Sequence, residues 1–260
     1  MLVFPGWILI AVILIGVFVA VVVLRRRAYG TPEARASLVL VVGRFVALLY
    51  AGLVTVGTLV GVIRMLVSDA VRVSLPVQQF WPETHPWITL SPAPPASVVG
   101  GGFTRADVMI EGLGLGARVV LAAGSVVQST AMVVVACVIA LLCHRLLSGI
   151  PFRPVLARST AVAAAALAIG GVVWAILLDI GGSMASNQVL GVSGWASYLP
   201  GTELPDYVAT HYAHSMTGLP GPALAVDVEL WPLLLALALA AISVAFRYSE
   251  RLQEDSEGLV

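Results

Sequence analysis

The sequence predicts an all-α integral membrane protein with five transmembrane helices. Apolar residues make up 59% of the chain and charged residues only 11%, whereas a soluble domain carries about 25% charged residues. Five long apolar runs are separated by segments rich in arginine or in loop residues. A spanning helix needs roughly 20 mainly apolar residues, because the hydrocarbon core is about 30 Å thick. The composition and the runs therefore indicate a chain that is solvated mostly by lipid.

The five apolar runs define the expected spans, which are residues 4–24, 45–63, 119–142, 160–178 and 231–246. The first run has no basic residue before it and is followed directly by Arg25, Arg26 and Arg27. A cleaved signal peptide has the opposite arrangement, with its positive charge first. We therefore expect a retained helix. Residues 1–37 then form an extra N-terminal transmembrane helix with a basic cytoplasmic linker, and residues 38–260 form a four-helix membrane domain.

The arginines indicate the orientation of the helices. Ten of the 14 basic residues fall in the short segments on one side, and four fall in the long segments on the other. Cytoplasmic segments carry the excess of positive charge in membrane proteins. We therefore expect the N-terminus outside, the C-terminus in the cytoplasm, and a multi-pass protein of the plasma membrane.

Two long segments, residues 67–118 and 179–230, are expected to be extracytoplasmic loops. Loops of this length without structure of their own are uncommon unless they are functional or disordered. The first contains two β-like runs, residues 71–75 and 87–90, and Pro- and Gly-rich breaks. We expect the two loops to pack together as a small cap. The alternative is two independent loops that lie on the lipid headgroups.

Small residues mark candidate helix contacts inside the membrane, where helices associate by close backbone approach. Gly57 and Gly61 form a Gly-x-x-x-Gly in the second span. In the fourth span, Ala163, Ala166 and Gly170 share one helix face by their spacing. These positions are candidate packing surfaces, although small residues are also frequent in spans that make no such contact.

Polar residues in and beside the spans bear on transport. Gln128 in the third span needs a hydrogen-bonding partner in hydrocarbon, which makes it a packing residue or, in a sharper reading, part of a substrate path. Arg64 and Asp179 lie at outer helix ends, where they can pair. No Asp, Glu or Arg falls in the middle of a span. This absence argues against a proton-coupled transporter, because such residues mark ion paths.

No motif points to catalysis or to a cofactor. His211 and His214 are spaced to share a helix face, but a third ligand at diagnostic spacing is missing, so we expect no metal site. The sequence contains no Gly-x-Ser-x-Gly and no phosphate-binding glycine loop. Its basic residues form no block long enough to bind nucleic acid. We therefore expect a non-enzymatic protein without cofactors and without direct nucleic-acid binding.

Two cytoplasmic segments resemble a known family. Residues 146–154 read Leu-Leu-Ser-Gly-Ile-Pro-Phe-Arg-Pro and lead into the fourth span, and the chain ends in Gln-Glu-Asp-Ser-Glu-Gly-Leu-Val. This pair resembles the bacterial membrane family catalogued as domain of unknown function 2975, over residues 38–260. Leu156 and Ser249 depart from the family, which often has asparagine and glycine there. The resemblance implies four spans with both termini inside.

Members of that family are often encoded beside a small helix-turn-helix DNA-binding protein. The resemblance therefore implies a membrane partner or sensor for such a regulator, docked at six cytoplasmic residues: Pro151, Phe152, Leu252, Glu254, Asp255 and Glu257. The alternative to docking is an ordinary solvated tail. The alternative function is a structural or accessory subunit of a larger membrane complex, which would bind other membrane subunits. A transporter ranks last, for want of charges in the middle of the spans.

Overall fold

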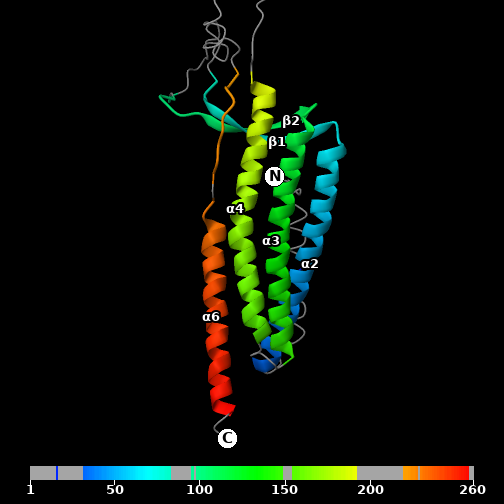
Figure 1. Ribbon diagram of the computed structural model, residues 1–260, viewed down its shortest axis with the longest axis vertical. Coiled ribbons are helices and arrows are strands. Elements are labelled where there is room, and N and C mark those ends of the chain that lie inside the picture. The colour runs from blue at the N-terminus through cyan, green and yellow to red at the C-terminus, as the bar shows by residue number, and fades with distance from the viewer. Residues whose placement is uncertain are drawn as a thin grey trace, which may run out of the picture. The chain divides into compact units, whose positions relative to one another are not determined.

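A computed structural model describes residues 16, 32–82, 95–96, 98–148, 154–191, 219–227 and 229–257, of which 32–38, 154 and 249–257 are described by their backbone alone. The elements are α2 (Pro32–Val67), β1 (Ala70–Phe80), β2 (Phe103–Glu111), α3 (Leu115–Leu147), α4 (Pro154–Leu190) and α6 (Trp231–Glu257), as Figure 1 shows. In this part of the chain four helices are long and apolar enough to cross a membrane. They contain the second to fifth predicted spans, and the first span lies outside the described residues apart from Gly16.

The described residues form two compact units. The first unit contains the described residues within 1–65, 122–176 and 228–260, and the second contains those within 66–121 and 177–227. Three of the helices, α2, α3 and α4, contribute residues to both units. Both segments that were predicted to be outer loops supply most of the second unit.

In the first unit, close contacts give the order of the helices. A Cβ added at Gly43 of α2 would lie 3.3 Å from Cys143 Sγ of α3. A Cβ added at Gly170 of α4 would lie 3.1 Å from the Cβ of Ala131 in α3. On its other side α4 meets α6, where Ser243 Oγ donates a hydrogen bond to the carbonyl of Ala157 at 2.7 Å. The neighbours are therefore α2 with α3, α3 with α4, and α4 with α6.

The second unit contains a two-stranded antiparallel sheet. β1 and β2 pair from Ala70–Glu111 to Pro76–Arg105, and the register shifts before the last pair, Phe80–Phe103. The inward residues of β1 are buried at alternate positions: Val71, Val73, Leu75 and Val77. This alternation is what a half-buried strand shows, because successive side chains point to opposite faces.

The end of α4 packs against the sheet edge. Ser186 Oγ donates to the carbonyl of Pro76 at 2.6 Å. A Cβ added at Gly182 would lie 3.2 Å from the carbonyl oxygen of Ser74, and one added at Gly181 only 2.6 Å from Leu121 Cγ. The two adjacent glycines therefore let the helix approach the sheet and the start of α3 closely.

Several element boundaries differ from the predictions. The expected loop 179–230 is wrong over its first part, because α4 continues to Leu190. Its Gly181-Gly182-Ser183 sequence is typical of a loop, yet in this setting the small residues permit close packing of a helix. The segment 67–118 contains a two-stranded sheet, and the described part of the chain is otherwise mostly helical, consistent with the predicted all-α membrane class. The β-like run 71–75 lies in β1, and the run 87–90 lies outside the described residues.

Candidate functional site

The predicted docking residues fall on one helix and one segment outside the described chain. Leu252, Glu254 and Asp255, with Glu257, lie in the last two turns of α6, whereas Pro151 and Phe152 lie outside the described residues. The apolar run of α6 ends at Phe246, directly before Arg247. Nine further helical residues, 249–257, carry four carboxylates, and we call this segment the acidic extension. Its backbone is a regular helix, which both docking and the alternative of an ordinary solvated tail allow.

The helical repeat sorts the acidic extension into faces. Positions 250, 254 and 257 are separated by four and three residues, so these three glutamates share one face. Position 252 is two residues from both 250 and 254 and therefore falls on the opposite face. The extension is about 14 Å long, since nine residues each rise about 1.5 Å. It is thus an amphipathic acidic helix continuous with an apolar one.

The predicted packing residues differ in how far they are buried. Gly61 and Ala163 are buried, and Gly57, Ala166 and Gln128 are half-buried. Gly170 lies at the contact between α3 and α4 described above. A polar contact that the sequence reasoning missed joins α2 to α3: Thr58 Oγ1 donates to Ser129 Oγ at 2.5 Å, and Ser129 donates in turn to the carbonyl of Ser125 at 2.8 Å.

His144, in the last turn of α3, contacts Arg44 of α2. Its Nδ1 lies 3.2 Å from Nη1 of Arg44, which can only donate. The contact joins the last turn of α3 to α2 and places Arg44, His144 and Arg145 near one another. Arg64, Arg118 and Arg105 belong to other parts of the chain.

A carboxylate and a guanidinium organise the polar side of the second unit. Asp179, whose side chain is 10% exposed, accepts from Arg105 Nη2 at 3.4 Å and from the backbone N–H of Asp227 at 2.7 Å. Arg105 also pairs with Asp227 at 3.3 Å, although that carboxylate is 80% exposed. The expected pairing of Asp179 with Arg64 is therefore wrong. Arg105 comes from β2, a strand that the sequence reasoning did not identify.

Arg118 holds together the region where α3 begins. Its Nε donates to the carbonyl of Leu113 at 2.8 Å, Nη1 to that of Ser68 at 2.6 Å and Nη2 to that of Asp69 at 3.1 Å. The residue is only 9% exposed. A charged group is stable at such burial only when its donors are satisfied. Arg118 is thus a structural residue rather than a binding one.

The described residues contain no group of three or more His, Cys, Asp or Glu side chains that could hold a metal ion. His211 and His214 lie outside the described residues. The cysteines of α3, Cys137 and Cys143, are free thiols.

Three comparisons with known proteins give no match. No protein-family model matches the chain, and neither a curated protein nor a solved structure matches it significantly.

Proposed function

We propose that this protein is a non-enzymatic membrane partner of a small cytoplasmic DNA-binding regulator, and that the acidic extension is its docking element. The observation that carries the proposal is the continuity of α6, which runs from an apolar stretch, Trp231–Tyr248, into the acidic extension without a break. A partner held there is fixed near the membrane by a helix rather than by a flexible tether.

Charge supports this choice of partner. Proteins that bind DNA neutralise phosphates with Lys and Arg and so present a basic surface. The shared face of Glu250, Glu254 and Glu257 is complementary to such a surface. Occupying the basic surface would also compete with DNA, so docking at the membrane would withdraw the regulator from its sites. The resemblance of the two cytoplasmic segments to the family named above also implies a small DNA-binding partner.

The placement of the partner depends on the orientation. The arginine excess favours a plasma-membrane protein with its C-terminus in the cytoplasm. The second unit would then lie outside and serve as the sensing part. Five spans, with the first at residues 4–24, complete this arrangement.

The decisive experiment is affinity purification of the tagged full chain from its native membrane, with mass spectrometry of the proteins that accompany it. We expect a small basic DNA-binding protein with the wild-type chain. Replacing the three glutamates, E250Q/E254Q/E257Q, should release it, and so should 0.5 M salt, since exposed charge pairs are screened within about 10 Å at 0.1 M salt.

A matched control replaces three acidic residues of the second unit, D107N/E111Q/D227N, and should retain the regulator. Two results contradict the proposal. One is retention of the regulator by the glutamate variant. The other is an eluate that holds other membrane subunits and no regulator, which would favour an accessory subunit of a larger complex.

A further inference from the structure

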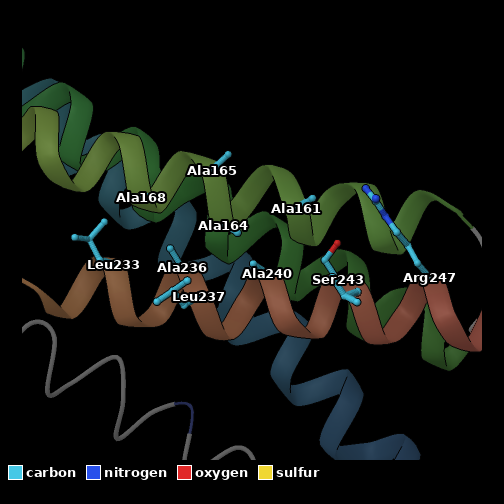
Figure 2. Close-up of a pocket in the computed structure, with 11 residues that line it drawn as sticks. Ala161, Ala164, Ala165, Ala168, Leu233, Ala236, Leu237, Ala240, Ser243 and Arg247 are labelled. Atoms are coloured by element: carbon cyan, nitrogen blue, oxygen red, sulfur yellow. The ribbon is translucent and has the colours of Figure 1, made fainter.

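A groove lies between α4 and α6 in the first unit (Figure 2). Its volume is about 600 Å³, and small or apolar side chains line it, among them Ala161, Ala164, Ala168, Ala236, Leu237 and Ala240. Small residues at spacings of three and four on both helices normally let transmembrane helices pack in direct contact. In this pair the facing alanines instead border an open space.

Contacts hold the two helices together at both ends of the groove. At one end, Ser243 Oγ donates to the carbonyl of Ala157 at 2.7 Å, and both groups are buried. At the other end, a Cβ added at Gly171 would lie 2.7 Å from Pro232 Cβ, and the rings of Trp174 and Trp231 are 6.1 Å apart. The space between α4 and α6 along the groove is therefore not caused by loose association of α6.

A guanidinium lies at one end of the groove. Arg247 is a lining residue, and Figure 2 shows its side chain extending from α6 towards α4. Arg158 of α4 directly follows Ala157, the acceptor of the Ser243 hydrogen bond, and is exposed. The groove is thus apolar along its length and basic at the end where Ser243 and Arg247 lie.

The depth of these groups matches a bilayer. Arg247 directly follows the apolar run of α6, residues 231–246, at the level where headgroups begin. Leu233 and Arg247 are 14 residues apart on one helix, which corresponds to about 21 Å. One leaflet of the hydrocarbon core is about 15 Å thick. An acyl chain that starts beside Arg247 therefore runs its whole course within the groove.

We propose that the α4–α6 groove binds one anionic phospholipid of the surrounding bilayer, with an acyl chain along the alanines and the phosphate beside Arg247. The apolar lining accepts the chain, and the guanidinium donates charge-assisted hydrogen bonds to phosphate oxygens in a bidentate geometry. Arg158 supplies further positive charge for an anionic headgroup. The proposal does not depend on docking of a regulator, because the groove and the acidic extension are separate parts of the chain.

Native mass spectrometry of the full chain in detergent, with added dioleoyl-phosphatidylglycerol or dioleoyl-phosphatidylcholine, tests this proposal. The wild type should retain one phosphatidylglycerol in preference to phosphatidylcholine. R247Q should lower the retained phosphatidylglycerol about tenfold, since a charge-assisted contact is lost. R247K should lower it less, because lysine keeps the charge but not the bidentate geometry.

Filling the groove tests the acyl-chain part. A240F should abolish retention of both lipids, and A165F, on the α4 side, provides a second variant in case the first fails to fold. The matched control is A238F, at an exposed position of α6 outside the groove lining, which should bind as the wild type does. Equal retention by A238F and the folded groove variants overturns the proposal, and so does an unchanged lipid preference in R247Q.

Discussion

At the scale of single residues, Arg118 is the clearest case of a charge used for structure. Its guanidinium satisfies carbonyls from two places in the chain, the turn after α2 and the turn before α3. Without it, these carbonyls lose their donors, and that of Leu113 belongs to a buried residue. Hydrogen bonds to charged groups contribute about 1.5–3 kcal/mol each, more than neutral ones.

We therefore expect Arg118→Ala to lower the free energy of unfolding by about 3 kcal/mol. Arg118→Lys should recover only part of this loss, because one ammonium cannot reach three carbonyls that are arranged for a planar fork. The measurement is thermal unfolding in detergent. The control is Arg72→Ala, an exposed arginine of β1, and equal destabilisation by the two alanine variants would contradict the role assigned to Arg118.

The partner of Asp179 could not be predicted from the sequence. Arg64 lies in the last turn of α2, as predicted. Asp179 does not lie at a helix end, because α4 continues to Leu190, and its partner is Arg105. Arg105 belongs to β2, whose residues Phe103–Glu111 include several polar ones and lack a strong apolar alternation. A strand of this kind is recognised from its partner, and pairing between residues 23 to 41 positions apart is not visible in local sequence.

At the scale of elements, the apolar runs were sufficient to find four helices but not their ends. Runs of leucine, valine and alanine predict a span because lipid leaves no other way to satisfy the backbone. The helices continue beyond the runs, α4 to Leu190 and α6 to Glu257. These extensions follow from packing in the second unit and from helix propagation into Glu- and Gln-rich sequence, which favours helix without being apolar.

Gly171 of α4 tests the contact between α4 and α6, and Gly52 of α2 provides a control glycine in another helix. A Cβ at Gly171 would lie 2.7 Å from Pro232 Cβ, closer than real Cβ atoms approach, whereas a Cβ at Gly52 of α2 meets no atom within 4 Å. Alanine favours a helix over glycine by about 1 kcal/mol. Gly52→Ala should therefore stabilise the protein slightly in thermal unfolding.

Gly171→Ala gains the same propensity but has to move α6 away from α4. We expect a net loss of about 1–3 kcal/mol, the usual cost of overpacking. A stability equal to that of Gly52→Ala would show that α6 can shift freely, contrary to the end contacts that define the groove.

For the molecule as a whole, the sequence predicted that the long segments 67–118 and 179–230 pack together as a cap. Local sequence patterns do not show how the two segments contact each other. Segments 66–121 and 177–227 form one compact unit. The alternation of Val71, Val73 and Leu75 indicated a strand with one buried face, and a buried face requires a cover. The end of α4, which was predicted to be part of a loop, packs against β1 at Pro76 and Ser74.

Charge at the helix ends predicts the orientation of the protein in the membrane. Four arginines, Arg44, Arg145, Arg158 and Arg247, lie on segments expected to face the cytoplasm. Translocating that many cations across the bilayer is opposed during insertion, and the positive-inside rule follows. The C-terminus of α6 and the turn at Ser148 should therefore be cytoplasmic, and the β1–β2 sheet should be external.

Single cysteines in a chain that lacks Cys137 and Cys143 test this orientation. An impermeant maleimide should label Asp107→Cys, an exposed position of β2, in intact cells. It should label Ser148→Cys and Ser256→Cys only after the membrane is permeabilised. Labelling of Ser256→Cys in intact cells would place the acidic extension outside, where no DNA-binding protein can reach it. The proposed docking would then fail, whereas the lipid groove would remain, because Arg247 lies at headgroup depth in either orientation.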